Sequence, residues 1–137
     1  SQWILIDAAR RRPIALRENL PMYQVIGERV IDTDFPKISE PQRIDEAAEF
    51  FIRFDDIDLN NHVNNAVYPL WASEAVGIDF RAAHTPAEIE VAFKKEGLYG
   101  EDIRVETEFD NLTTIHRIKA TGDGRELARV RICWIGI

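Results

Sequence analysis

Apolar and polar residues alternate regularly from residue 47 onward, and this pattern predicts five strands and one helix. In the first strand, expected over 48–55, apolar side chains recur at every second position, as in a half-buried strand: Phe50, Ile52 and Phe54. The same period returns in four later segments: 88–94, 103–109, 113–121 and 128–134. The sequence Gly122-Asp123-Gly124 is typical of a hairpin turn between the last two strands.

A single helix is predicted over 66–78, between the first two strands. Its apolar residues are three and four positions apart, which places them on one face: Val67, Leu70, Trp71, Ala75 and Ile78. Asn64 or Asn65 is a good N-cap, and Pro69, which has no amide hydrogen, belongs in the first turn. One apolar helix followed by a four-stranded meander predicts an α+β fold, with an antiparallel sheet wrapped around the helix.

Residues 1–46 follow a different pattern. A short apolar run, Trp3–Ile6, precedes three adjacent arginines, and four prolines are spread over the rest of the segment. Prolines spaced in this way indicate a linker that lies over a surface, with one short helix near 22–31. We therefore divide the chain into a linker segment, 1–46, and a compact domain, 47–137.

Composition narrows the class of protein. Hydrophobic residues make up 45% of the chain, charged residues make up 30%, and the formal net charge is −7, which argues against nucleic acid as the main partner. We expect no membrane segment, because no apolar run approaches the ~18 residues that a membrane helix needs, and no signal peptide. Cys133 is the one cysteine, so no internal disulfide can form, and a structural thiol in the cytoplasm is the expectation.

The densest group of polar residues, Asp55–Asn65, lies between the first predicted strand and the helix. Turn-forming Asp and Asn suit any loop, but His62 among them is less expected there. Asp58, Asn60 and His62 are two residues apart, so an extended loop would direct their side chains the same way. The residues alone leave two interpretations open, a solvated loop and a site for acid–base chemistry on water.

Two further features are compatible with acyl hydrolysis and leave the solvated loop open as well. Glu96 ends the second predicted strand and offers a carboxylate from another part of the chain. The helix start near Asn64 and Asn65 offers free N–H groups and a positive dipole end, which suit a developing oxyanion. We therefore name Asn64 and Asn65 as candidate substrate-binding residues.

Other chemistries fail on the spacing of their motifs. A calcium loop beginning at Asp56 would need Gly and Glu where the chain has Asn61 and Val67. Zinc needs several His, Cys or acidic ligands in a recognisable spacing, and no serine nucleophile motif or phosphate-binding glycine loop occurs. We expect no metal and no cofactor.

The segment Asp58–Asn65, followed by Tyr68, Trp71 and Glu74, resembles the active-site motif of the fatty acyl-ACP thioesterases. The resemblance implies the hotdog fold, in which an antiparallel sheet wraps a long central helix. It also implies that Asp58, Asn60, His62 and Glu96 take the places of the family's catalytic Asp, Asn, His and Glu. Metals and cofactors are not implied.

One position departs from the family's pattern. Gly97 stands where the family has a cysteine after its glutamate. The resemblance therefore implies that a thiol at this position is not the nucleophile, and that a water activated by Glu96 is the consistent scheme.

The segment Trp3–Asp7 with Arg11-Arg12-Pro13 resembles the end of the first domain and the linker in two-domain acyl-ACP thioesterases. On this basis residues 1–46 are the tail of a preceding hotdog domain plus a linker, and residues 47–137 are the thioesterase domain. The expected partner is acyl carrier protein (ACP) in fatty acid biosynthesis. A homodimer or pairing with a second hotdog domain is also expected, with Trp3–Ile6 at an edge or interface, because an open sheet edge invites pairing.

Two other functions remain open at this point. The first is a single-hotdog acyl-CoA thioesterase of the 4-hydroxybenzoyl-CoA thioesterase type, which shares the segment His62–Asn65. The second is a non-catalytic acyl-binding or dimerisation module. The acyl carrier distinguishes the two enzymes, and loss of turnover on mutation distinguishes catalysis from binding.

Overall fold

The computed structural model describes residues 5–7, 9–10, 12–15, 19 and 36–137. The chain divides into two compact units, residues 1–35 and 36–137. In the first unit, strand β1 (Leu5–Asp7) pairs antiparallel with β2 (Arg12–Ile14), so this part of the expected Trp3–Ile6 strand has a partner within its own unit. Trp3, Ile4 and the helix expected near 22–31 lie outside the described residues.

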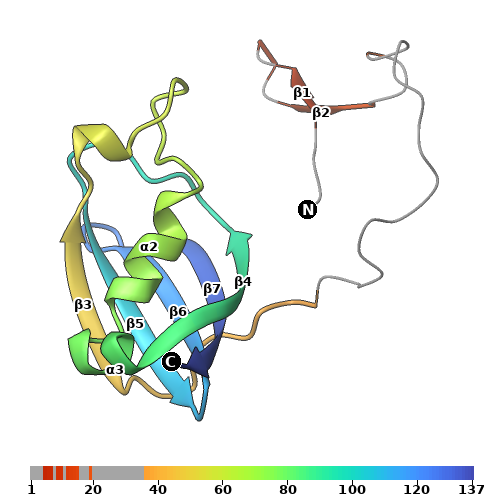
Figure 1. Ribbon diagram of the computed structural model, residues 1–137. Coiled ribbons are helices and arrows are strands. Elements are labelled where there is room, and N and C mark those ends of the chain that lie inside the picture. The colour runs from red at the N-terminus through yellow and green to blue at the C-terminus, as the bar shows by residue number, and fades with distance from the viewer. Residues whose placement is uncertain (1–4, 8, 11, 16–18, 20–35) are drawn as a thin grey trace. The chain divides into compact units, whose positions relative to one another are not determined.

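The second unit is a five-stranded antiparallel sheet that curves around helix α2 (Figure 1). Its strands, in chain order, are β3 (Glu46–Phe51), β4 (His84–Phe93), β5 (Asp102–Asp110), β6 (Thr113–Ala120) and β7 (Glu126–Gly136). Their order in the sheet is β3-β5-β6-β7-β4, so β3 and β4 form the two edges. The predicted α+β architecture with five antiparallel strands is confirmed.

The first strand of this sheet ends earlier than its alternation predicts. β3 stops at Phe51, and the 3-10 turn η1 (Phe54–Asp56) follows. Asp56 closes this turn because its carboxylate accepts hydrogen bonds from the backbone N–H and the guanidinium of Arg53, at 2.8 and 2.9 Å. Phe54, which alternation assigned to the strand, is consequently 78% exposed.

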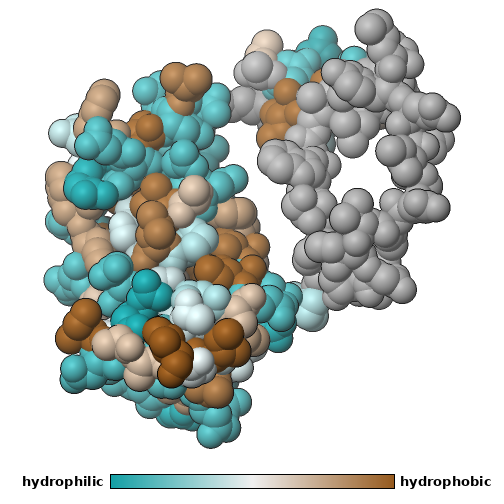
Figure 2. Space-filling model, in the orientation of Figure 1, coloured by the Kyte–Doolittle hydropathy of each residue, from teal (hydrophilic) through white to brown (hydrophobic). Residues whose placement is uncertain are grey.

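The helix is also shorter than the predicted range 66–78. Helix α2 spans Val67–Glu74, and a second helix, α3 (Ile78–Ala83), begins after Gly77. Gly77 has φ +79°, a left-handed conformation that glycine adopts at little cost, and it separates the two helices. Of the predicted apolar face, Trp71 and Ala75 are buried, whereas Leu70 and Ile78 are exposed; Figure 2 shows apolar side chains at the surface over α2 and α3.

The core lies between α2 and the inner face of the sheet. Trp71 from α2 packs in one buried cluster with apolar side chains from the three central strands: Ile103, Val105, Ile118, Ala128, Val130, Ile132 and Trp134. Burying each large apolar side chain stabilises the fold by about 1.5–3 kcal/mol. No helix in the described part of the chain is long and apolar enough to cross a membrane.

One histidine is buried in this core. The ring nitrogens of His116 lie 3.0 Å from Thr107 Oγ1 and 2.7 Å from Thr114 Oγ1, and Trp134 Nε1 donates to the same Thr114 oxygen. Burial lowers the pKa of His116 to about 3, so its imidazole is neutral near pH 7. These hydrogen bonds satisfy both ring nitrogens inside the core.

Candidate active site

The polar loop before α2 is closed by its own backbone. Ile57 and Val63 form an isolated antiparallel bridge, and the N–H of Asp58 donates to the carbonyl of His62 at 2.8 Å. Asn61, at the tip, has φ +63°, which asparagine tolerates better than most residues. The loop therefore presents a defined set of side chains at one end of the sheet.

Asp58 holds this loop in place. Its Oδ1 accepts hydrogen bonds from the N–H groups of Asn60 (2.7 Å) and His62 (3.3 Å), and its Oδ2 accepts from the Asn60 side-chain amide at 3.4 Å. These bonds, above all the one from the Asn60 backbone, lower the pKa of Asp58 below its ordinary value. Asp58 is therefore an ionised carboxylate directed at its own loop.

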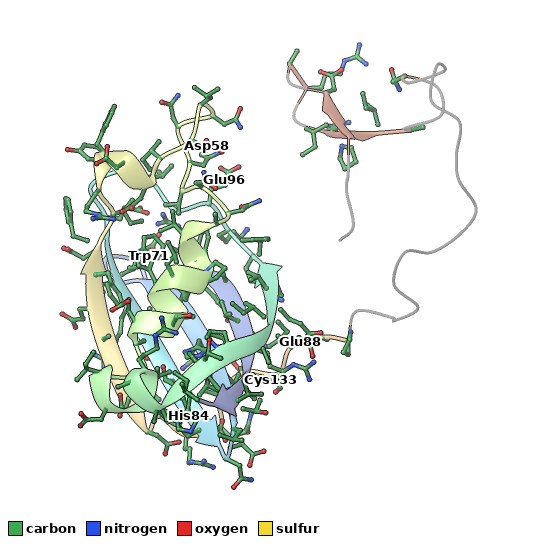
Figure 3. All side chains as sticks on the ribbon, viewed as in Figure 1. Asp58, Trp71, His84, Glu88, Glu96 and Cys133 are labelled. Carbon is green, nitrogen blue, oxygen red and sulfur yellow. The ribbon has the colours of Figure 1, made fainter. Side chains whose placement is uncertain are left out.

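His62 and Glu96 meet although they lie on distant parts of the chain. Glu96 follows β4, and its Oε2 lies 3.1 Å from His62 Nε2. Next to this contact, the N–H of Val63 donates to the carbonyl of Gly97 at 3.0 Å, which joins the two segments through their backbones. Figure 3 shows Asp58 and Glu96 at the same end of the domain.

A surface hollow of about 270 Å³ opens beside this pair. The loop before α2 contributes Asp58, His62, Val63 and Asn65 to its lining, and α2 contributes Tyr68. The end of β4 and the residues directly after it contribute the rest: Phe93, Lys94, Lys95 and Glu96. The rings of Tyr68 and Phe93 pack edge to face, with centroids 5.4 Å apart. The hollow thus combines a carboxylate–imidazole pair with an apolar wall, an arrangement that suits a thioester next to an acyl chain.

The predicted site residues take different positions around the hollow. Asn60 is exposed and its side-chain amide donates a hydrogen bond to Asp58, but Asn60 does not line the hollow. The predicted N-cap is wrong: Ala66 is the N-cap, because Asn64 forms a turn ahead of the helix and accepts the Ala66 N–H at 3.0 Å. Asn65 does line the hollow.

Sequence analysis did not assign Phe93, Lys94 or Lys95 to the site. Their adjacency to Glu96 was a usable signal, because residues next to a site carboxylate in the sequence also lie near it in space. Among the described residues, no three His, Cys, Asp or Glu side chains gather closely enough to hold a metal ion.

Among the solved structures that share this fold are three thioesterases. The 12:0-ACP thioesterase from Umbellularia californica superposes with a TM-score of 0.74 at 18% identity, covering 96% of this chain and 53% of that one. An acyl-ACP thioesterase from Bacteroides thetaiotaomicron gives 0.74 at 17% identity, covering 95% and 53%. A 1,4-dihydroxy-2-naphthoyl-CoA thioesterase from Synechocystis gives 0.60 at 14% identity, covering 67% and 81%. These likenesses define a hotdog fold of the kind found in thioesterases.

The family follows from the sequence match. The family model "Acyl-ACP thioesterase C-terminal domain" matches residues 39–136, and the chain belongs to this family of thioester hydrolases. The resemblance seen in the sequence motif is therefore confirmed. The chain spans about half the length of the two acyl-ACP thioesterases named above, 53% of each. No curated protein matches it in sequence.

Proposed function

We propose that this domain hydrolyses fatty acyl-ACP thioesters with a water molecule that Glu96 activates as a general base. The observation that carries the proposal is the contact between His62 Nε2 and Glu96 Oε2, 3.1 Å, at the wall of a hollow with an apolar side. Glu96 is 63% exposed, so water reaches its carboxylate directly. A positioned general base contributes about 10²–10⁴-fold to a rate.

The proton balance of the reaction is simple. Glu96 takes a proton from water as the water oxygen attacks the carbonyl carbon of the thioester. The tetrahedral intermediate then collapses, the carbon–sulfur bond breaks, and the proton from Glu96 passes to the departing thiolate. His62 orients the Glu96 carboxylate through their contact, while Asp58 and Asn60 hold the loop that carries His62.

The carbonyl oxygen needs hydrogen-bond donors as it gains negative charge. Two N–H groups at the helix start, those of Ala66 and Val67, already donate to Asn64, at 3.0 and 2.9 Å. Asn65 lines the hollow, so we assign it the role of holding this oxygen. A single donor of this kind contributes about 10²–10³-fold.

The acyl carrier is assigned from the family rather than from the fold, because coenzyme A thioesterases share the fold. The family match and the two acyl-ACP thioesterase structures support ACP. The Synechocystis structure, a CoA thioesterase of which the chain covers 81%, supports acyl-CoA as the second candidate.

The test is release of free thiol by the purified protein from matched acyl-ACP and acyl-CoA substrates over a series of chain lengths. A higher kcat/KM with acyl-ACP is the expected result. Faster turnover of acyl-CoA would assign the second candidate. Binding of acyl thioesters without turnover of either would instead identify a non-catalytic acyl-binding module and overturn the proposal.

A further inference from the structure

Gly97, the residue after Glu96, is buried against three apolar side chains. A Cβ atom added there would lie 2.9 Å from Val63 Cγ2, 3.2 Å from Ile52 Cδ1 and 3.3 Å from Leu127 Cδ1. Real Cβ atoms essentially never approach another heavy atom within 3.0 Å. The space that any other residue would need at this position is therefore already filled.

The neighbours of Gly97 have little room to move. Ile52, Val63 and Leu127 all belong to the buried core cluster, and interiors of this kind are close-packed. Val63 is also β-branched, so its side chain is restricted to few rotamers. A larger residue at position 97 therefore requires Val63 to shift, and the packing around it opposes that shift.

The need for glycine here is steric rather than conformational. Three described glycines adopt a positive φ, and Gly97 is not one of them: Gly77, Gly100 and Gly124. The backbone of Gly97 is therefore open to any residue, and only its surroundings exclude a side chain. A cysteine, the residue at the corresponding position of the family's pattern, would not fit here without displacing Val63.

The same close approach holds the candidate catalytic pair together. Val63 follows His62, Gly97 follows Glu96, and the N–H of Val63 donates to the carbonyl of Gly97 at 3.0 Å. Pushing these two residues apart separates the segments that place His62 Nε2 3.1 Å from Glu96 Oε2. A misplacement of about 1 Å can lower a catalysed rate by ~10²-fold.

We propose that Gly97 is a positioning residue: the absence of its side chain allows Val63 to approach, and this approach sets the contact between His62 and Glu96. Ile52, Val63 and Leu127 have taken the room that a side chain at position 97 would occupy. The inference rests on the proposed function for its kinetic consequence, but the geometry at His62 can be measured without turnover.

The experiment compares Gly97→Ala with the double variant Gly97→Ala/Val63→Ala, which removes the Cγ2 atom that a new Cβ would meet at 2.9 Å. We expect Gly97→Ala to lower kcat by at least tenfold with a smaller change in KM. The double variant should return kcat to within a few-fold of Val63→Ala alone. Gly122→Ala is the matched control, because a Cβ there meets nothing within 4 Å, and its kcat should equal that of the parent protein.

A second readout follows the His62 ring by ¹⁵N NMR. Its Nε2 signal should shift in Gly97→Ala, return toward the parent position in the double variant and stay unchanged in Gly122→Ala. If the parent protein hydrolyses no thioester, the proposed function fails, and the NMR result alone decides on the positioning role.

Two outcomes would overturn the inference. One is a folded Gly97→Ala variant with kcat within twofold of the parent and an unchanged His62 signal. The other is a double variant whose kcat remains tenfold below that of Val63→Ala. If Gly97→Ala alone does not fold, this comparison of the double variant with Val63→Ala still tests the inference.

Discussion

At the residue scale, the two acids of the site have different surroundings. Asp58 accepts three hydrogen bonds within its own loop, and these bonds keep its pKa low. Glu96 projects from the other segment toward His62 and solvent. A carboxylate whose oxygens are already occupied by backbone donors is a poor proton acceptor, so we assign the base role to Glu96 and loop support to Asp58.

Substitution of Asp58 should separate loop support from base chemistry. Asp58→Ala removes the acceptor for the N–H groups of Asn60 and His62, so kcat should fall at least tenfold. Asp58→Asn keeps one carbonyl oxygen and should retain more activity than Asp58→Ala. Steady-state kinetics of the two variants measure this difference, and full activity in Asp58→Ala would contradict the loop-support role.

His116 makes stability depend on pH. Its pKa is about 3 in the folded protein, against an ordinary value of 6.5. Between these values the unfolded chain binds a proton that the native state does not. The free energy of unfolding should therefore decrease by about 1.4 kcal/mol for each unit that the pH falls through this window.

Urea unfolding of the parent protein and His116→Gln, between about pH 4 and 7, tests this contribution. The variant lacks the titrating ring, so its free energy of unfolding should fall less steeply with decreasing pH. The difference in slope between the two proteins should be about 1.4 kcal/mol per pH unit, the contribution of one proton. Parallel curves for the two proteins would show that His116 does not supply the dependence.

At the element scale, α2 presents two adjacent residues to opposite environments. Trp71 is 5% exposed and contacts the rings of Phe50 and Tyr68, whereas Leu70 is 63% exposed. Trp71→Ala should lower the free energy of unfolding by about 3–5 kcal/mol, since it leaves a large cavity. Leu70→Ala should change it by no more than about 0.5 kcal/mol. Comparable losses for the two variants, measured by chemical denaturation, would contradict this packing of α2.

Strand β7 carries the cysteine on the face away from the core. Cys133 is partly buried, pairs in register with Glu88 and Thr113, and is flanked by the buried Ile132 and Trp134. Cys133 is not among the residues that line the hollow. Cys133→Ser should therefore keep the hydrolysis rate within a few-fold of the parent. Selective inactivation by a thiol reagent at Cys133, without loss of fold, would assign the thiol a role in the reaction.

At the scale of the whole molecule, the sheet has two edges, and β4 is the one that leads into the site. Ile89 and Phe93 on this edge strand are exposed apolar residues, and an exposed strand edge invites pairing. We predict that the protein self-associates as a two-fold homodimer or pairs with a second hotdog domain. Light scattering at micromolar concentration, before and after deletion of residues 1–7, tests this. A fully active monomer would show that no pairing is needed.

Much of this architecture was predictable, because its causes are local. The alternation along β7 depends on one buried face, and Ala128, Val130, Ile132 and Trp134 all lie on it. The end of β3 and the break at Gly77 were missed for different reasons. The apolar alternation continues to Phe54, although the strand has already ended. A helical spacing of apolar residues does not reveal a single left-handed residue such as Gly77, which separates α2 from α3.

In the site, too, the residues themselves were predictable from the sequence, whereas their contacts were not. His62 and Glu96 were both singled out in the sequence, but their contact depends on how β4 returns beside the loop. The packing around Gly97 depends on Ile52 and Leu127, which lie far from it in sequence. Close approaches of this kind arise only when the whole sheet has formed.

The central claim is that Glu96 activates water for thioester hydrolysis, and one comparison tests it most directly. Glu96→Gln keeps the size of the side chain but removes the base, and Glu88→Gln makes the same change on β4 at an exposed residue that does not line the hollow. With acyl-ACP as substrate, kcat should fall about 10²–10⁴-fold in Glu96→Gln and stay at the parent value in Glu88→Gln. Hydrolysis by Glu96→Gln at the parent rate would contradict the account.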